Sequence, residues 1–396
     1  AGRRGLDALV ESISVLQGGA LVASTLESDI LPARVAGYRA ADLDELCTSG
    51  HVVWTGAGAL GGTDGRVRLC FRDQVHLLGG ETVEEAPPGS VHDALRSHLA
   101  AHGACFWAEL RAAAPEATDG ELLAALWDLV WAGEVTNDSI APLRAYVTAT
   151  RGTRSGRGPV SRTRGARPRP GRLTQIGPPA GAGRWSLIAP LLSPAPTPTE
   201  AAHARALQLL ERHGILTREA ALAEGVPGGF AGVYGVLKVL EERGQARRGY
   251  FVSGLGAAQF ALPGAVDRLR DAREAPAEDG GPLVLAATDP AQPYGAALSW
   301  PDSPGRPARS AGALVVSVSG TALVWFDPRA RHLVTFPAAA TDKRWAEALA
   351  MLVKDGRLRT AEVRKVDGNP LASGDVDDAL RAAGFAEGYR GRVLRG

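Results

Sequence analysis

A helix-ending pattern of two leucines and a glycine recurs along the chain. Its form is Leu-x-x-Leu-x-x-x-Gly, and three copies end at Gly50, Gly133 and Gly244, spaced by roughly 100 residues. The two leucines lie one turn apart on a single helix face, and glycine readily adopts the left-handed conformation that ends a helix. The third helix of a winged helix passes into its wing in this way. The repeat therefore predicts tandem winged-helix modules, a fold whose usual ligand is nucleic acid.

Beyond Pro282 the pattern changes to short apolar runs bounded by proline, glycine and aspartate. Such runs predict the strands of a small barrel or sandwich. One helix, expected over 342–354, interrupts them and ends in a fourth copy of the pattern at Gly356. Because this copy lies outside the expected winged helices, the pattern is less specific than three matches suggest.

Periodicity and turn signals together predict an α+β protein, with tandem winged-helix domains followed by a small C-terminal β-barrel. The predicted segments are a winged helix at 1–82, a winged helix at 83–150, an Arg-rich linker or loop at 151–180, a winged helix at 181–275, and a β-barrel with one or two helices at 276–396. The chain opens abruptly at Ala1-Gly2-Arg3-Arg4, which we expect of a fragment of a longer polypeptide.

The charge balance restricts where nucleic acid can bind. The chain has 44 lysines and arginines against 43 aspartates and glutamates, so its net charge of +1 creates no global field toward DNA or an anionic membrane. Any nucleic-acid site must therefore be a local patch. The odd set of Cys47, Cys70 and Cys105 indicates buried free thiols in a reducing cytoplasm. Without a signal peptide or an apolar run of about 20 residues, we expect a cytoplasmic protein with no membrane partner.

Two basic patches are candidates for DNA contact. Between residues 151 and 172 arginines stand among Gly, Ser, Thr and Pro with no acidic residue. This segment either contacts phosphates by counterion release or is a plain cationic linker. Its candidate DNA-binding residues are Arg154, Arg157, Arg162 and Arg164.

The second basic patch is Arg247, Arg248 and Tyr250, where the third wing is expected to begin. Two guanidiniums and an aromatic ring can hold phosphates and stack on a base. The alternative is a solvated strand edge whose charges discourage aggregation.

Several motifs favour ordinary structure over catalysis. The G-x-G-x-x-G match at Gly56–Gly61 is followed by a second strand, where a dinucleotide site needs a helix, so we interpret it as a wing tip. No P-loop and no nucleophile elbow occur in the sequence. His98, His102 and Cys105 could hold zinc, but no fourth ligand stands at a usual spacing, and no metal site is predicted.

The segment from Thr288 to Gly295 joins two expected strands of the C-terminal barrel. Its Asp-Pro and Tyr-Gly steps are ordinary turn chemistry. A carboxylate on a stiff loop beside aromatic rings also suits N-glycosidic cleavage, because it can orient water while a flipped base stacks. Asp289 is then the candidate acid, with Tyr294 and Trp300 as candidate stacking residues.

With these motifs in place, the chain resembles the C-terminal region of the bacterial Lhr (large helicase-related) DNA helicases. The resemblance runs nearly from end to end, and its matching blocks are Leu31–Val35, Leu129–Asp138, Gly228–Phe230, Leu240–Gly244 and Arg248–Val252, together with Asp289-Pro290. It implies that the helicase core lies upstream in the same polypeptide, where ATP and magnesium would bind, and that this region needs no cofactor of its own. It also implies a homotetramer that binds DNA, single-stranded or duplex, in DNA repair.

The order of three winged helices and a barrel is also similar to the AlkZ-type DNA glycosylases. Their first module carries a Gln-apolar-Gln or Gln-apolar-Asp triplet, which this chain lacks there; the nearest residues are Gln17, Glu27 and Asp29. Besides Asp289, the candidate catalytic residues on this reading are therefore Asp29 and Glu27. Two hypotheses follow: a non-catalytic module for assembly and DNA binding, or a glycosylase that removes uracil or a damaged base.

Overall fold

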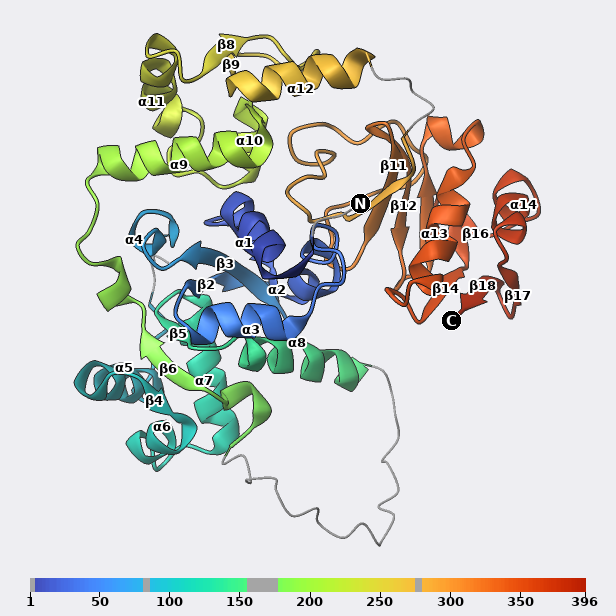
Figure 1. Cartoon of the computed structure of the whole chain (residues 1–396). Helices are drawn as coiled ribbons and strands as arrows, with labels where there is room; N and C mark the ends of the chain where they lie inside the picture. Colours follow the sequence, from blue (N-terminus) through green and yellow to red (C-terminus); the bar gives the residue numbers. More distant parts are fainter. Residues whose placement is uncertain (1–3, 81–85, 155–176, 275–279) are drawn as a thin grey trace, which may run out of the picture. The chain divides into compact units, whose positions relative to one another are not determined.

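The computed structural model describes residues 4–80, 86–154, 177–274 and 280–396, with the side chains of residues 150–154 left out. The chain divides into two compact units, one formed by residues 1–27 and 34–208 and the other by residues 28–33 and 209–396. Module 2 and all of module 1 except residues 28–33 lie in the first unit, and the C-terminal domain lies in the second. Module 3 lies mostly in the second unit, because its first helix runs across the boundary (Figure 1).

Module 1 is a winged helix with a long two-stranded wing. Its elements are α1 (Gly5–Leu16), β1 (Leu21–Val22), α2 (Ala23–Thr25), the π-helical turn η1 (Leu26–Ile30), α3 (Ala40–Thr48), β2 (Val52–Ala59), β3 (Gly65–Phe71) and α4 (Val75–Leu78). The sheet has the order β1-β3-β2. Gly58 and Gly61 lie in or beside the β2–β3 hairpin with positive φ, so the glycine-rich motif is the tip of a wing, as predicted.

Module 2 is a winged helix whose last strand comes from far along the chain. Its elements are α5 (Ser90–His102), β4 (Cys105–Phe106), α6 (Trp107–Ala113), α7 (Asp119–Trp131), β5 (Val135–Asn137) and β6 (Arg184–Leu187), in a sheet of order β4-β6-β5. Helix α8 (Ala141–Arg154) and the short η2 (Pro179–Gly181) lie between β5 and β6. The module therefore continues to Leu187, beyond the predicted end at residue 150, and the Arg-rich segment is an insertion within its wing.

Module 3 follows the short η3 (Ala189–Leu192). Its elements are α9 (Pro198–His213), β7 (Ile215–Leu216), α10 (Arg218–Ala223), α11 (Ala231–Glu242), β8 (Arg247–Gly249), β9 (Gln259–Ala261) and α12 (Pro263–Glu274). The sheet order, β7-β9-β8, has the same arrangement as β1-β3-β2 and β4-β6-β5. The prediction of tandem winged helices within an α+β protein is confirmed.

The glycines of the repeat end their helices as predicted. Gly50, Gly133 and Gly244 have φ values of 76°, 76° and 72°. The amide of Glu134 donates to the Leu129 carbonyl at 2.9 Å, and that of Gln245 donates to the Leu240 carbonyl at 2.8 Å. Bonds of this span satisfy the last carbonyls of a helix.

The C-terminal domain is built on an open sheet. Its elements are β10 (Leu283–Ala286), β11 (Leu314–Val318), β12 (Thr321–Asp327), β13 (His332–Thr335), η4 (Pro337–Ala340), α13 (Arg344–Lys354), β14 (Thr360–Val363), β15 (Lys365–Val366), β16 (Asn369–Pro370), α14 (Asp375–Ala382), β17 (Ala386–Gly388) and β18 (Gly391–Arg395). Six strands pair in the order β10-β11-β12-β13-β15-β16, and three more pair as β14-β18-β17.

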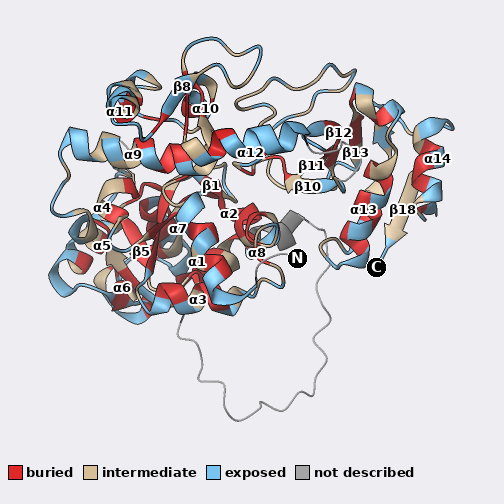
Figure 2. Cartoon of the chain, turned by 45° about the horizontal axis from the view of Figure 1, so that its top comes forward, coloured by how far each residue is buried: buried red, intermediate tan, exposed pale blue. Residues whose placement is uncertain are grey.

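The predicted C-terminal β-barrel is not confirmed, because among the described residues the outer strands β10 and β16 do not pair with each other. Helix α13 covers the apolar face of the sheet, which a closed barrel would otherwise bury in its interior. Trp345 and Leu349 are fully buried in one core with Val316 and Phe326 of the sheet. Figure 2 shows the buried face of α13 and the exposed face opposite. The sheet thus covers its apolar face with a helix.

Cys47, Cys70 and Cys105 are buried and form no disulfide, as the sequence predicted. Among the described residues, no helix is both long enough and apolar enough to cross a membrane.

Candidate nucleic-acid interface

Helix α7 of module 2 occupies the position where a winged helix usually reads DNA, yet it is enclosed on most sides. Leu122, Leu126, Leu129 and Val130 are each 0 % exposed, and Trp127 is 2 % exposed. Its exposed stripe consists of Asp119, Gly120, Glu121, Ala124 and Asp128. Three of these five residues are acidic and would repel phosphate, so α7 is poorly suited to enter a groove.

The wing of module 1 encloses α7. A Cβ atom on Gly56 of β2 would lie 1.7 Å from the Val130 carbonyl oxygen, so only glycine permits this approach of wing and helix. Thr136 also donates its hydroxyl hydrogen to the Trp54 carbonyl at 2.6 Å. The wing of module 1 therefore packs directly against α7, the helix at the recognition position of module 2, and against the following strand β5.

Aromatic rings fill the same junction. The Trp54 and Trp127 ring centroids lie 6.4 Å apart, and the Trp127 ring stacks on Tyr146 of α8 at 4.2 Å. Trp185 of β6 contacts both tryptophans edge-on. The Trp127 indole nitrogen donates to the Ala180 carbonyl at 3.0 Å. The packing and satisfied indole nitrogen are those of a structural core.

Helix α3 of module 1 faces an ion cluster. Arg144 of α8 donates to both carboxylate oxygens of Glu27, at 2.8 and 2.9 Å, and pairs with Asp44 at 3.2 Å. Tyr38 donates its hydroxyl hydrogen to Glu27 at 2.6 Å. The hydrogen bond to Glu27 raises the pKa of Arg144, and burial followed by the Glu27 charge raises the pKa of Tyr38. Sequence reasoning missed this cluster, because Glu27 and Arg144 are far apart in the chain.

Both predicted carboxylates of module 1 have close partners. Glu27 has both oxygens occupied in the cluster just described. Asp29, on the same π-helical turn, accepts a hydrogen bond from the Ser28 hydroxyl at 2.6 Å. An ion-paired carboxylate is a weak general base, so the geometry at Glu27 favours a structural role.

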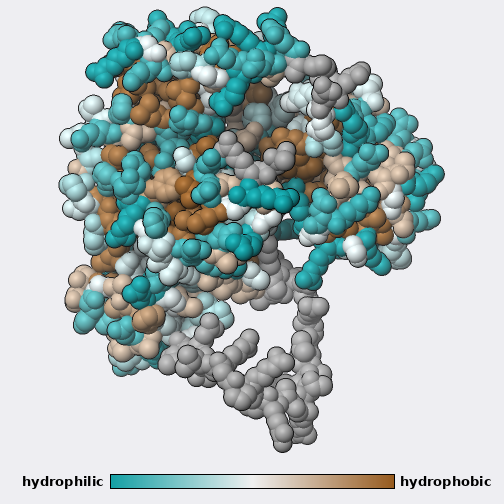
Figure 3. Space-filling model, viewed as in Figure 1, coloured by the Kyte–Doolittle hydropathy of each residue, from teal (hydrophilic) through white to brown (hydrophobic). Residues whose placement is uncertain are grey.

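Helix α11 of module 3 differs from α7, because one of its faces is open. Val233, Leu237 and Leu240 are buried, while the opposite face is exposed (Figure 2). The exposed residues are Ala231, Gly232, Gly235, Lys238, Val239 and Glu242. Figure 3 shows hydrophobic surface around this helix. Small side chains let a helix backbone approach a partner closely, and Lys238 is the one cation among these exposed residues.

The wing beside α11 carries the basic residues that the sequence singled out. Arg247 and Arg248 lie exposed on β8, and Tyr250 just beyond it is 84 % exposed. Arg248 pairs with Glu241 at 3.2 Å, with 44 % of its side chain still accessible. Figure 1 shows β8 next to α11 within module 3. The structure thus brings Arg247, Arg248 and Tyr250 together on one edge.

Arg157, Arg162 and Arg164 lie outside the described residues. For Arg154 only the backbone is described, as the last residue of α8. Their assignment to DNA contact stays a prediction.

The Asp289 loop is closely held in the C-terminal domain. Asp289 is 0 % exposed, and its carboxylate accepts a hydrogen bond from the Ala291 amide at 2.8 Å. Arg309 donates to the carbonyls of Asp289 and Gln292, at 3.1 and 2.6 Å. These contacts favour the turn interpretation, because a carboxylate in this position reaches a substrate only if the loop moves.

The predicted stacking residues pack on each other. The Tyr294 and Trp300 rings stack with centroids 6.2 Å apart, and Trp300 stacks on Phe336 at 6.0 Å. The Tyr294 hydroxyl donates to the Gly320 carbonyl at 2.8 Å. The two rings meet as expected, but in this arrangement they form part of a core.

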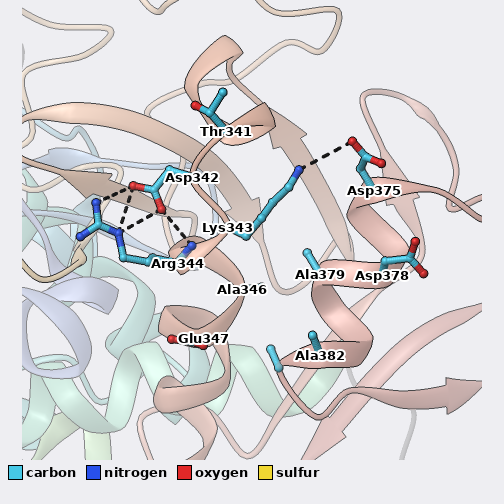
Figure 4. Close-up of a pocket in the computed structure, with 11 residues that line it drawn as sticks. Thr341, Asp342, Lys343, Arg344, Ala346, Glu347, Asp375, Asp378, Ala379 and Ala382 are labelled. Carbon is cyan, nitrogen blue, oxygen red and sulfur yellow. Dashed lines mark hydrogen bonds and ion pairs between the residues drawn. The ribbon is translucent and has the colours of Figure 1, made fainter. Parts of the chain in front are cut away.

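Two cavities among the described residues have no aromatic residue in their lining. A pocket of about 890 Å³ lies between α13 and α14, where Asp342 pairs with Arg344 at 2.7 Å and Lys343 approaches Asp375 at 4.0 Å (Figure 4). A pocket of about 480 Å³ lies between modules 1 and 2, with Arg184 of its lining paired to Asp138 at 2.8 Å. Without a ring to stack on, neither resembles a pocket for a flipped base.

Models of two winged-helix domains of large helicase-related proteins match residues 1–72 and 195–280. The Lhr helicase and probable uracil glycosylase of Mycolicibacterium smegmatis is 43% identical to the chain over 99% of its length. The Lhr helicase and uracil glycosylase of Escherichia coli K12 is 34% identical over 98%. The chain belongs to the Lhr family. It corresponds to the C-terminal part of these larger proteins and spans 27% and 26% of their lengths.

Among solved structures, the DNA glycosylase AlkZ of Streptomyces sahachiroi is similar to this Lhr module. The TM-score is 0.52 at 14% sequence identity, and the match covers 92% of this chain and 94% of that one. At this identity the likeness shows a shared fold. The predicted similarity to AlkZ-type architecture is confirmed at that level.

Proposed function

We propose that this Lhr module holds DNA for a helicase core in the same polypeptide, and that module 3 makes the main contact. The observation that carries the proposal is the contrast in exposure between α7 and α11. Helix α7 is enclosed and its exposed stripe is acidic, whereas α11 is open beside the exposed guanidiniums of Arg247 and Arg248. A local basic edge is what a chain of net charge +1 needs for binding to phosphate.

The proposed contact does not depend on base sequence. Bases are read in the major groove chiefly by Arg, Lys, Asn and Gln side chains. The exposed face of α11 offers Lys238 alone, and its Nζ lies 4.0 Å from Glu242. Phosphate contacts position a protein without specifying sequence. We therefore expect similar affinity for unrelated duplexes of equal length.

The test is the double variant Arg247→Ala/Arg248→Ala, assayed for DNA binding by fluorescence anisotropy over a salt series. Loss of two phosphate contacts should lower the slope of log affinity against log salt by about 2. It should also weaken binding roughly 10-fold or more at moderate salt.

The matched control is Arg66→Ala/Arg72→Ala, which removes two exposed arginines from the β3 side of the module 1 wing. It should leave both the affinity and the salt slope nearly unchanged. If the control variant loses as much binding as the module 3 variant, the contact is not concentrated on module 3 and the proposal fails.

A second candidate function is removal of uracil from DNA, because both Lhr relatives carry uracil glycosylase in their names. We propose Asp289, Asp29 and Glu27 as the carboxylates to test, with Tyr294 and Trp300 as stacking residues. The assay is formation of alkali-labile abasic sites in uracil-containing DNA. Activity abolished by Asp289→Asn, with unchanged thermal stability, would support that residue, while no product from the wild-type chain would exclude the activity.

We also propose that the module assembles into a homotetramer, as the Lhr resemblance implies. Light scattering on the 396-residue chain is the direct measurement. A mass near four chains at micromolar concentration supports assembly, and a monomer contradicts it.

A further inference from the structure

Tyr250 is a large aromatic side chain held almost entirely in solvent, although its backbone is firmly fixed. It is 84 % exposed and directly follows β8. Burial of a ring of this size against a partner is strongly favourable. The contacts that hold the neighbouring backbone therefore bear on how the ring can be used.

Gln259 of β9 fixes the backbone around Tyr250. This side chain is 0 % exposed, and its carbonyl oxygen accepts hydrogen bonds from the Phe251 and Val252 amides, both at 2.8 Å. Its amide nitrogen donates to the Val252 carbonyl at 2.9 Å. A buried amide with both ends satisfied resists movement of the segment that it holds.

Phe251 is turned the other way. A Cβ atom on Gly249 would lie 3.1 Å from the Phe251 ring, so this ring covers the last residue of β8. The wing thus packs one aromatic residue and presents its neighbour to solvent. Because residues two apart in an extended chain point to the same side, Tyr250 projects on the side of Arg248.

We infer that Tyr250 stacks on an unpaired base next to a duplex end, so that module 3 prefers a junction between single-stranded and double-stranded DNA. This inference rests on the proposed DNA contact of module 3. Arg247 and Arg248 would hold backbone phosphates while the ring covers the first exposed base. Stacking needs no particular base, which agrees with the lack of base-reading side chains on α11. Because the backbone next to Tyr250 is already held by Gln259, ordering of that segment on binding costs little conformational freedom.

The experiment compares the affinity of the full 396-residue chain for a tailed duplex and a blunt duplex of the same length. Tyr250→Ala should weaken binding to the tailed duplex at least ~5-fold and change blunt-duplex binding much less. Tyr250→Phe should keep the preference, because it keeps the ring. Fluorescence of 2-aminopurine at the first unpaired position should fall on binding to the wild-type chain and not to Tyr250→Ala.

Tyr389 gives a matched control. It is 89 % exposed, and the Arg390 guanidinium lies 5.4 Å from its ring centroid. Tyr389→Ala should leave the preference for the tailed duplex unchanged. Equal losses on tailed and blunt DNA for Tyr250→Ala, or failure of Tyr250→Phe to keep the preference, would overturn the inference. Normal binding by Arg247→Ala/Arg248→Ala would instead overturn the proposed module 3 contact itself.

Discussion

Helices α7 and α11 share a sequence signature, a sheet arrangement and a place in the winged-helix fold, but they differ in exposure. Both end in Leu-x-x-Leu-x-x-x-Gly, with the two leucines buried and the glycine in the left-handed conformation. Helix α7 carries Trp127, Val130 and Trp131 at the positions where α11 has a lysine and two glutamates, Lys238, Glu241 and Glu242. The three apolar residues of α7 pack in the junction with module 1.

The difference teaches that the repeated pattern specifies the module and the residues around it specify its use. A winged helix whose recognition position meets another wing is a structural support. One whose recognition position carries small side chains and a basic wing can meet a polyanion. The repeated pattern cannot distinguish these outcomes, because the wing that covers α7 comes from a different part of the chain.

The largest expected effect is on the stability of the enclosed helix. Trp127→Ala should lower the free energy of unfolding by about 3–5 kcal/mol, because it leaves a cavity among Trp54, Trp185 and Tyr146 and removes a buried hydrogen bond. Val239→Ala on the open face of α11 should cost less than about 0.5 kcal/mol. Urea denaturation followed by circular dichroism measures both. Equal costs would mean that α7 and α11 are not differently buried.

A smaller effect is a difference in acid sensitivity between module 3, which contains α11, and the aromatic junction around α7. Burial opposes ionisation of Glu224 at the end of α10, but the Arg212 charge and the His213 hydrogen bond outweigh it and lower its pKa from 4.5 to about 2. Its stabilising contribution, on the order of 3 kcal/mol, is therefore complete above pH 4.5 and is lost as the pH falls toward 2. The tryptophans of the junction around α7 carry no group that titrates in this range.

Hydrogen exchange in acid measures this difference. Peptides from 209–262 should lose protection between pH 4.5 and 2, before peptides from 119–137 do. In Glu224→Gln the protection of module 3 should be lower at neutral pH and much less sensitive to acid. Simultaneous loss in both regions of the wild-type chain would contradict a separate ion cluster in module 3.

The smallest effect concerns the reactivity of Cys47 on α3. Burial, followed by the nearby charges of Asp44 and Glu27, raises the pKa of this thiol to about 12. Because the thiolate is the reactive form, Cys47 should resist alkylation at pH 8 in the folded chain and react fully in urea. Mass spectrometry of iodoacetamide-treated protein checks this. Rapid labelling of the native chain would mean that α3 of module 1 is as open as α11.

Local features of the fold could be predicted from the sequence, and long-range ones could not. The glycines, the buried leucine faces and the wing tip at Gly58 follow from neighbouring residues. Strand β6 pairs with β5 from the far side of the insertion, so nothing near residue 150 marks the module as unfinished. Closure of a barrel likewise depends on which strands pair, and strand patterns alone do not say that β10 and β16 remain edges.

The candidate site could also be predicted only where its residues are neighbours in the sequence. Arg247, Arg248 and Tyr250 are adjacent in sequence, so their grouping required no knowledge of tertiary structure. The partners of Glu27 and Asp289 are Arg144 and Arg309, from distant segments, and only the folded chain reveals these contacts. The sequence shows that α11 contains several small residues, but only the structure shows that these residues are exposed.

The central claim is that α11 meets DNA and α7 does not, and one pair of variants tests it directly. A Cβ atom on Gly235 meets no other atom within 4 Å, and Ala124 is an exposed small residue of α7. Gly235→Glu and Ala124→Glu therefore place the same negative charge on the two helices without steric conflict, and Gly235→Ala controls for the loss of glycine.

The measurement is the dissociation constant of each variant for a duplex at low salt. We predict that Gly235→Glu weakens binding roughly 10-fold or more, while Ala124→Glu and Gly235→Ala bind like the wild-type chain. Weakening by Ala124→Glu that equals or exceeds that by Gly235→Glu would contradict the account.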